Sequence, residues 1–415
     1  MHSVRPLSVI VLVAVIALGV APGASGAASP EPPASPGAST SPQASASPGS
    51  SVVPSLSPTS SPVPAPAWEQ TLGSMQPLGQ LTDVTTWAGG FAAIGVDANG
   101  DPRAWISEKG DSWTSAPFPL GPQREPGLGA VGDRLVAVAI VRHGSSQHLA
   151  AWTSADGVDW TRAPDGPELR LPGQSQAGCL RLGEPFELSG TLVVHGYCDG
   201  CCGATAAPIA AAGPHALLVR AAKEPAGAYA WTTRDGRTWT RHPVRAPVPD
   251  VGCIVADGER LLSLEYASPL IDSTDGIHWH PIGDVPILQG PPGGACVLPT
   301  AEGYVQVGES IGEAGAASGV GAATSVDGVT WTPVTLLAGL DEVESALAVG
   351  GAILVDGYRH ESDTDEPVPA QLISLDNGHT WAPTSGWPST TIAANDTTMV
   401  AVGQGAWTAP LFYGA

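Results

Sequence analysis

Short apolar runs alternate with turn-forming residues along most of this chain. The runs are rich in Val, Ile, Leu and Ala, and Gly, Pro, Asp and Ser fall between them, which is typical of β-strands joined by tight turns. Six runs that precede a tryptophan-containing phrase are predicted to be strands: Phe91–Val96, Arg134–Val141, Leu192–Gly196, Arg260–Tyr266, Tyr304–Gly308 and Ala352–Gly357. Two more strands are expected near the C-terminus, at Thr398–Gly403 and Ala406–Phe412.

The phrase that follows these runs is Ser-x-Asp-Gly-x-x-Trp. Four copies begin at Ser154, Thr233, Ser273 and Ser325, a copy with one extra residue begins at Ser374, and a decayed copy begins at Ser107. Asp-Gly between two apolar runs predicts a hairpin, because Gly accepts positive φ and an Asp side chain bonds nearby backbone N–H groups. The Trp is expected to start the following strand and to bury a large ring.

The phrase tryptophans, from Trp113 to Trp381, lie 47, 79, 40, 52 and 50 residues apart, and most of these intervals match one blade of a β-propeller. Each unit has room for about four short strands. No hairpin precedes Trp68, so the strand around it is expected to become the outer strand of a last blade built from residues 391–415. The sequence therefore predicts an all-β fold, a closed seven-bladed β-propeller with about 50 residues per blade.

Composition agrees with many short strands and tight turns. The 415 residues include 52 Gly and 41 Pro without a three-residue period, which excludes collagen and argues against a long helical bundle. The ratio of 13 Trp to 4 Phe indicates a repeated structural role for tryptophan. A formal net charge of -22 argues against a nucleic-acid partner.

The first 66 residues are predicted to lie outside the propeller. Arg5, the apolar run Leu7–Ala21 and the small residues at 25–27 are typical of an export signal, assigned to residues 1–27. Residues 28–66 are almost entirely Ala, Ser, Pro, Gly and Thr, which predicts a disordered linker. The propeller is assigned to residues 67–415, and the protein is expected to be secreted or at the cell surface. A membrane is expected as a partner only if the signal segment is uncleaved and anchors the chain.

The recurring phrase resembles the Asp-box, or bacterial neuraminidase repeat, of sialidase-like β-propellers. The resemblance covers residues 68–415, although four copies are one residue shorter than the usual family phrase and only the copy with Asp376 has full length. In that family Asp-boxes lie on the rim, between the third and fourth strands of a blade. The resemblance therefore implies an architectural role, without substrate contact, for Asp156, Trp160, Asp235, Trp239, Asp275, Trp279, Asp327, Trp331, Asp376 and Trp381.

The best-known activity of that family is cleavage of sialic acid. For such an enzyme the resemblance implies three arginines around a carboxylate, a Tyr nucleophile with a Glu base, and an Asp acid. This sequence has no Phe/Tyr-Arg-Ile-Pro segment, which carries the first of those arginines in the family. No pair of carboxylates can be chosen from the sequence, so the catalytic residues stay unknown, and no cofactor is expected.

One loop on the face that usually binds ligands in propellers is strongly polar. It runs from Tyr358 to Glu366 and supplies the candidate binding residues Arg359, His360, Glu361, Asp363 and Asp365. Alternating carboxylates such as Asp363 and Asp365 could hold Ca²⁺, but the pattern lacks the Gly and the distal Glu of a known calcium loop. The favoured interpretation is a solvated acidic loop without a metal.

All six cysteines lie in one third of the chain: Cys179, Cys198, Cys201, Cys202, Cys253 and Cys296. An even count in an exported chain favours disulfides. Cys179, Cys253 and Cys296 each begin a unit, so they are expected on innermost strands of consecutive blades, and Cys253 and Cys296 are candidates for a bridge. One of the other three is expected to bond Cys179. Cys198 and Cys201 have the spacing of half a zinc site, but no second spaced pair follows.

Three functions remain open on the sequence. The favoured one is a non-catalytic propeller that binds a glycan, a peptide or an envelope protein through its top loops. The first alternative is a glycoside hydrolase of sialidase-like fold. The second alternative is an assembly factor of a membrane complex. The expected partner is accordingly a glycan or an extracellular protein.

Overall fold

The structure is a computed structural model. It describes residues 68–72, 78–120, 126–143, 146–170, 180–198, 228–245, 249, 253–264, 269–286, 288–289, 296–310, 319–349, 351–360, 367–384, 391–403 and 405–411. The predicted signal segment and linker, residues 1–66, lie outside this set. Within the set the regular elements are strands and one short 3₁₀ helix, η1 (Pro167–Leu169), and no helix is long and apolar enough to span a membrane.

The strands form seven antiparallel sheets, the blades, which follow one another along the chain. Blade 1 contains β2 (Leu78–Trp87), β3 (Gly90–Asp97), β4 (Pro102–Ser107) and β5 (Thr114–Pro117). Blade 2 contains β6 (Gly127–Val131), β7 (Arg134–His143), β8 (Ser146–Ser154) and β9 (Thr161–Arg162). Blade 3 contains β10 (Leu180–Leu188), β11 (Thr191–Cys198), β12 (Ala228–Thr233) and β13 (Thr240–Val244).

The remaining blades repeat this order. Blade 4 contains β14 (Val255–Asp257), β15 (Arg260–Leu264), β16 (Leu270–Ser273) and β17 (His280–Gly283). In blade 5, β18 (Leu288–Gln289) and β19 (Cys296–Thr300) both pair with β20 (Gly303–Ser310), followed by β21 (Gly319–Ser325) and β22 (Thr335–Leu336). Blade 6 contains β23 (Glu342–Val349), β24 (Ala352–Arg359), β25 (Val368–Ser374) and β26 (Ala382–Thr384). Blade 7 contains β27 (Ile392–Ala394), β28 (Thr398–Val402), β29 (Ala406–Pro410) and β1 (Glu69–Gln70).

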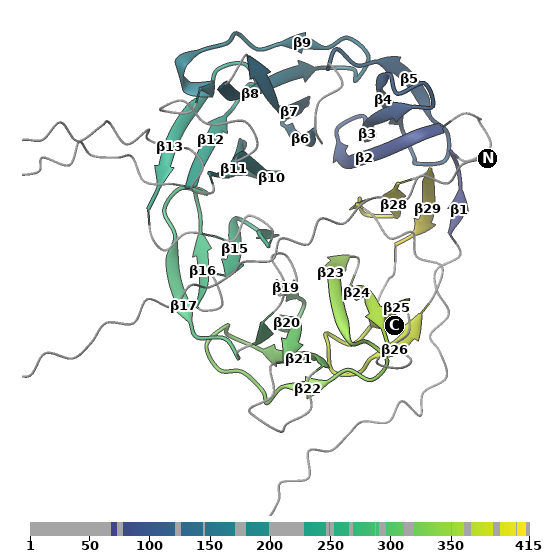
Figure 1. The fold of residues 1–415 in the computed structure, drawn as a ribbon, viewed down its shortest axis with the longest axis vertical. Coiled ribbons are helices and arrows are strands. Elements are labelled where there is room, and N and C mark those ends of the chain that lie inside the picture. The colour runs from purple at the N-terminus through teal and green to yellow at the C-terminus, as the bar shows by residue number, and fades with distance from the viewer. Residues whose placement is uncertain are drawn as a thin grey trace, which may run out of the picture. The chain divides into compact units, whose positions relative to one another are not determined.

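The ring closes through the N-terminal strand. β1 pairs with β29, with Glu69 opposite Thr408 and Gln70 opposite Trp407. The backbone N–H groups of Thr71 and Leu72 both donate to the carbonyl of Ala406, at 2.9 and 3.2 Å. Figure 1 shows β1 beside β29, with the seven sheets arranged around a centre. The prediction of a seven-bladed propeller closed by an N-terminal outer strand is confirmed.

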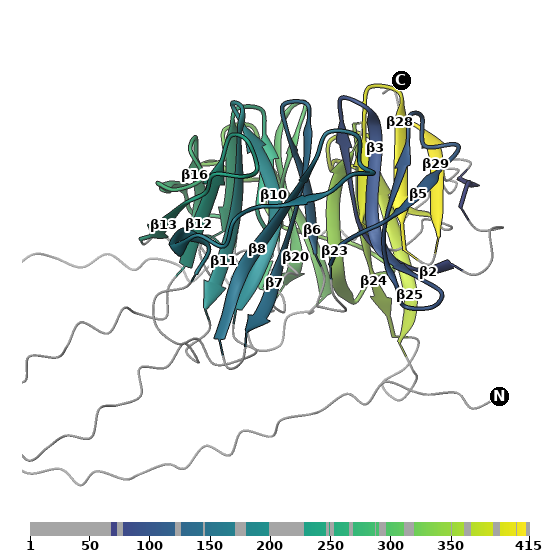
Figure 2. The ribbon, with the colours of Figure 1, turned by 90° about the horizontal axis from the view of Figure 1, so that it is seen from above.

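Apolar side chains are buried between neighbouring blades. Six of the seven hydrophobic clusters join strands of two consecutive blades, including one that joins blade 7 to blade 1, and the cluster between blades 5 and 6 also includes Val255 of blade 4. In blades 1–6 the phrase tryptophan packs on the cluster shared with the preceding blade, as Trp239 does between blades 2 and 3. Strands of adjacent blades stand side by side in Figure 2, so these clusters run between sheets. The high tryptophan content therefore reflects inter-blade packing.

The recurring phrase connects the third strand of a blade to the fourth. In blade 2, Ser154 Oγ accepts the N–H of Gly157 at 2.7 Å, and Asp156 Oδ1 accepts the N–H groups of Val158 and Asp159 at 2.9 Å each. The Trp160 indole donates back to the Gly157 carbonyl at 3.0 Å. The prediction that the Trp starts the next strand is wrong, because its ring turns back into the packing between blades and β9 begins one residue later.

A disulfide joins Cys253 to Cys296, with the Cα atoms 5.5 Å apart, as predicted. Cys296 begins β19, but Cys253 lies two residues before β14, so only one of the two belongs to an innermost strand. Cys198 ends β11, while Cys179, Cys201 and Cys202 lie outside the described residues.

Candidate functional site

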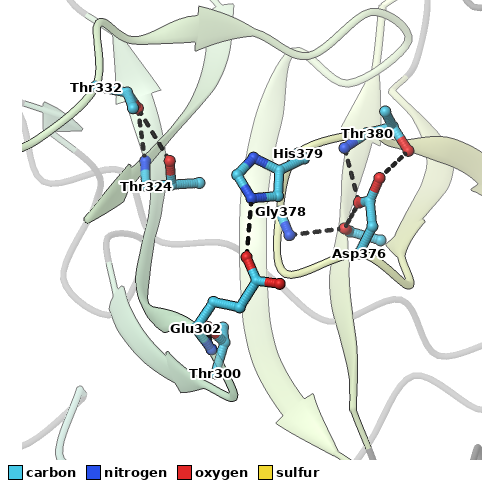
Figure 3. A network of polar contacts seen from close by, with 9 residues as sticks. Thr300, Glu302, Thr324, Thr332, Asp376, Gly378, His379 and Thr380 are labelled. Atoms are coloured by element: carbon cyan, nitrogen blue, oxygen red, sulfur yellow. Dashed lines mark hydrogen bonds and ion pairs between the residues drawn. The ribbon is translucent and has the colours of Figure 1, made fainter. Parts of the chain in front are cut away.

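The aspartates of the recurring phrase belong to closed hydrogen-bond networks. In blade 6, shown in Figure 3, Asp376 accepts the backbone N–H and the hydroxyl of Thr380, at 2.8 and 2.6 Å. His379 next to it lies 3.4 Å from Glu302 of blade 5. Burial would raise the pKa of Asp376, but hydrogen bonds from Thr380 outweigh it and lower the pKa. These carboxylates are occupied by their own turns.

The candidate binding loop starts at the opposite end of blade 6, because adjacent antiparallel strands reverse direction. Arg359 ends β24 and His360 follows it, both exposed, while Glu361, Asp363 and Asp365 lie outside the described residues. The His360 backbone N–H donates to Asp341 at 2.6 Å, and its Nε2 lies 3.2 Å from Glu342 Oε1. The start of the loop is thus held against the first residues of β23.

A row of polar residues crosses blade 6 just below this loop. Ser345, Asp356, Gln371 and Thr384 are successive cross-strand partners on β23, β24, β25 and β26. Cross-strand partners share one face of a sheet, so the four side chains lie on the same face. All four are partly or fully exposed.

The same face is apolar one row further from the loop. There the partners are Leu347, Leu354, Ile373 and Ala382, which pack with blade 7 through Met399. The face of blade 6 that is turned toward blade 7 therefore changes from buried and apolar to accessible and polar along its strands. We name its upper part the blade 6 polar face, formed by Glu344, Ser345, Asp356, Tyr358, Gln371 and Thr384.

A β-bulge brings Glu344 to this face. The register of β23 against β24 shifts between Val343 and Ser345, which leaves Glu344 as the extra residue. Bulges re-aim side chains in this way. Tyr358, two residues after Asp356 and therefore on the same side of β24, hydrogen-bonds the Glu344 carboxylate, and Asp356 hydrogen-bonds Gln371.

The pKa values of this face are shifted by burial and by like charge. Burial raises the pKa of Asp356, and the negative charge of Glu344 adds to the shift. The hydrogen bond to Glu344, together with its charge, raises the pKa of Tyr358. At the end of the neighbouring blade 5, burial and the charge of Glu342 raise the pKa of Glu309. Asp356 is thus biased toward its protonated form. It lies near the Glu344 carboxylate, which is hydrogen-bonded to the Tyr358 phenol, and together these groups can donate and accept protons.

A second pair of carboxylates lies on the innermost strands of blades 1 and 3. Asp83 accepts the backbone N–H groups of Val84 and Leu128, at 2.7 and 2.6 Å, and is only 7% exposed. Burial, with the charge of Glu184 added, raises the pKa of Asp83 to about 8. Glu184 reaches solvent but has protein on most sides, and this enclosure raises its pKa. Both oxygens of Asp83 are occupied by the backbone, so this residue links blades 1 and 2.

In the described part of the chain no group of three or more His, Cys, Asp and Glu could hold a metal ion. The calcium alternative considered for Asp363 and Asp365 concerns residues outside that part. The expectation of a metal-free loop stays a prediction.

The residues predicted from the sequence include two at the edge of the blade 6 polar face and none at its centre. Arg359 and His360 lie beside it, but Glu344, Asp356 and Gln371 were not among the candidates. One signal was present, because Asp356 interrupts the apolar run that was predicted as a strand. A charged residue inside such a run indicates a position that the core does not cover.

This chain has limited similarity to solved structures. No protein-family model matches the chain, and no curated protein matches it. Among solved structures, the β-propeller domain of the Trilobed protease from Pyrococcus furiosus is 9% identical, with a TM-score of 0.42 over 80% of this chain and 97% of that chain. The α-L-arabinofuranosidase Arb93A from Fusarium graminearum is 10% identical, with a TM-score of 0.40 over 80% of this chain and 93% of that chain.

A third similar structure is the exo-β-1,3-galactanase 1,3Gal43A from Clostridium thermocellum. It is 13% identical, with a TM-score of 0.32 over 68% of this chain and 63% of that chain, so this chain spans less than two thirds of it. Several of the similar structures are glycoside hydrolases built on β-propellers. At these identities and TM-scores the likeness carries no information about function.

Proposed function

We propose that this protein is a carbohydrate-active β-propeller that binds a glycan at the blade 6 polar face and hydrolyses a glycosidic bond there. One observation carries the proposal: Tyr358 is hydrogen-bonded to Glu344, and Asp356, a carboxyl group biased toward its protonated form, lies on the same face. An acid and a base in different environments, close together and accessible, are what glycoside hydrolysis requires.

Each side chain has a distinct role in this proposal. Asp356 protonates the oxygen of the leaving group, because burial and the charge of Glu344 raise its pKa and favour the protonated form. Tyr358 attacks the anomeric carbon while Glu344 accepts the phenolic proton, the division of labour that the resemblance to sialidase-like propellers implies. Water, deprotonated by Asp356, then attacks the anomeric carbon and breaks its bond to Tyr358, and Glu344 returns the proton to the phenolic oxygen. Gln371 bonds the Asp356 carboxyl group and holds its orientation.

One observation favours a second candidate, glycan binding without hydrolysis at the same face. The carboxylates around Tyr358 raise the pKa of the phenol, so Tyr358 stays protonated and acts as a hydrogen-bond donor. In this alternative the blade 6 polar face offers carboxylate, amide and hydroxyl groups to sugar hydroxyls. Both candidates use the same residues, and they differ only in whether a bond is broken.

Hydrolysis of aryl glycosides by the purified full-length chain separates the two candidates. Glu344→Gln, Asp356→Asn and Tyr358→Phe each remove one ionisable group of the face, and loss of general acid–base catalysis is expected to lower kcat by about 10²-fold or more. Asp133→Asn is the matched control, because Asp133 is an exposed carboxylate in the β6–β7 turn of blade 2.

The outcomes point in different directions. Turnover that is lost in the three variants and kept in D133N supports hydrolysis. Sugar binding without turnover, weakened by the same variants, supports the second candidate. Turnover or binding that is unchanged in all three variants would contradict a function at the blade 6 polar face.

We also propose that the protein works outside the cytoplasm. The Cys253–Cys296 disulfide is consistent with an oxidising compartment, where such bonds persist. The export signal predicted at residues 1–27 supports the same location.

A further inference from the structure

We infer that the blade 6 polar face accepts uncharged or amino sugars and rejects sugars that carry a carboxylate, an inference that rests on the proposed function. Among propellers with the resemblance described above, the sugar expected at first is sialic acid, which is itself a carboxylate. The charges around this face point to a different class of substrate.

Negative charge is concentrated where the sugar would lie. Glu344 and Asp356 belong to the face, and Glu342 begins the same inner strand. Glu309 at the end of β20 interacts electrostatically with Glu342. Among the described residues next to this face the cationic side chains are Arg359 and the ionisable His360, and His360 is already bonded to Glu342. A carboxylate on the sugar would enter a field of its own sign.

The pKa values of the carboxyl groups near this face reflect the same negative charge. Asp356 is shifted by burial and then by Glu344, and Glu309 by burial and then by Glu342, each toward the uncharged form. A further negative charge in the same place is repelled in the same way. The chain as a whole has a formal net charge of -22. An uncharged hydroxyl donates to these carboxylates without that cost, and an ammonium group gains from them.

The rest of the face has groups that suit a neutral polyhydroxylated ligand. Ser345, at the inner end of the polar row, is exposed and has a hydroxyl group. Trp407 lies two residues before Ala409 on β29, and Ala409 packs against blade 6, so the Trp407 ring is on the side of blade 7 that is turned toward the polar face. It is partly exposed, and small-molecule sites commonly combine aromatic rings with a few polar groups.

Matched pairs of sugars that differ only in a carboxylate test this inference. The probes are the methyl hexosides of glucose, galactose and mannose, the corresponding methyl uronides, methyl glucosaminide and a methyl sialoside. Dissociation constants are measured by calorimetry on the full-length chain at low and high salt. We expect the best hexoside to bind about tenfold or more tighter than its uronide at low salt, with a smaller ratio at high salt because salt screens the repulsion. The glucosaminide is expected to bind at least as tightly as the glucoside.

A charge-removing variant checks that the selection comes from this face. Glu342→Gln is expected to narrow the hexoside-to-uronide ratio, whereas D133N, a carboxylate removed from blade 2, leaves the ratio unchanged. A uronide or sialoside that binds as tightly as its neutral counterpart would overturn the inference while leaving the proposed function intact. Absence of binding to every sugar on the panel would instead remove the proposed function, and the inference with it.

Discussion

At the residue scale, the glycine of each recurring phrase is required both by a positive φ and by a close contact with the preceding blade. Gly236 has a φ of 70°, in the region that disfavours side chains, and a Cβ added there would lie 2.3 Å from Thr153 Cγ2 of the preceding blade. The same contact with the preceding blade recurs at Gly157, which meets Ile106, and at Gly378, which meets Val305. The phrase glycines are therefore points of close contact between one blade and the preceding blade.

Gly236→Ala is expected to lower the free energy of unfolding by about 2–4 kcal/mol, from backbone strain plus overpacking. Gly132→Ala is the control, because Gly132 has a φ of 57° but no atom within 4 Å of its added Cβ. That variant carries the strain alone and should lose about 1 kcal/mol. Urea unfolding of both variants measures the difference. Equal losses would show that the contact with blade 2 costs nothing.

One copy of the phrase departs from the others at a single hydrogen bond. In five copies the Trp indole donates to the phrase glycine, for example Trp239 to Gly236 at 3.0 Å. In blade 4, His195 of blade 3 lies 2.7 Å from the Gly276 carbonyl instead. Trp279 Nε1 and His195 Nδ1 are then buried without a hydrogen-bond partner among the described residues. Burial lowers the pKa of His195 to about 4.

His195 therefore makes folding sensitive to acid. Between pH 6.5 and pH 4 the unfolded chain binds a proton at His195 that the folded chain does not, so stability falls as the pH falls, by up to about 3 kcal/mol. His195→Leu is expected to remove this part of the slope, and the difference between variant and parent is measured by denaturant unfolding across that range. Exposed His379→Gln serves as control. If the free energy of unfolding of H195L falls with pH as steeply as that of the parent, the assignment of this pH dependence to His195 is refuted.

At the scale of elements, bulges on innermost strands place carboxyl groups that the alternation of residues does not predict. The register shifts in β2 between Leu81 and Asp83, in β10 between Leu182 and Pro185, and in β23 between Val343 and Ser345. Asp83, Glu184 and Glu344 lie at these shifts. Each of these three shifts thus coincides with a carboxyl group near another carboxyl group.

Asp83 links two of these elements, since it accepts backbone N–H groups of β2 and β6. Its pKa of about 8 in the folded chain lies above the ordinary value of 3.8, so the folded chain keeps a proton that the unfolded chain releases, and stability falls as the pH rises from about 4 to 8. In Asp83→Asn the decline of stability with rising pH should be smaller. One of the two backbone N–H groups also loses its acceptor, which lowers the free energy of unfolding by about 1 kcal/mol. Unfolding at several pH values checks this. An unchanged decline would show that Asp83 titrates normally.

The strands could be predicted because apolar runs and turn residues mark them directly. The predicted run Ala352–Gly357 became β24 (Ala352–Arg359), and Thr398–Gly403 became β28 (Thr398–Val402). The candidate site was only partly predictable for a physical reason. Its residues come together through cross-strand register and a bulge, and neither follows from a linear pattern of apolar and polar positions.

At the scale of the whole molecule, closure of the ring depends on very few residues. β1 has two residues, and the remaining contacts of this segment include the Trp113 indole, which donates to Thr71 Oγ1 at 3.1 Å. The segment thus joins the outer edge of blade 7 to the phrase of blade 1. The sequence predicted this closure because Trp68 had no hairpin before it and the last blade lacked a strand.

Removal of residues 1–73 is expected to leave β29 as an unpaired edge, which lowers the melting temperature and promotes association of chains. A chain that begins at residue 67 keeps β1 and serves as the matched control. Calorimetry and light scattering compare the two. Equal melting temperatures and equal monomer fractions would mean that β1 does not contribute to the stability of the ring.

The position of a bound sugar tests the central claim most directly. A crystal structure of the full-length chain soaked in the best-binding hexoside should show the sugar in contact with Glu344, Asp356 and Tyr358, with its ring near Trp407. A sugar bound instead at the turns of the recurring phrase, or on the strands of another blade, would contradict the claim that the blade 6 polar face is the functional site.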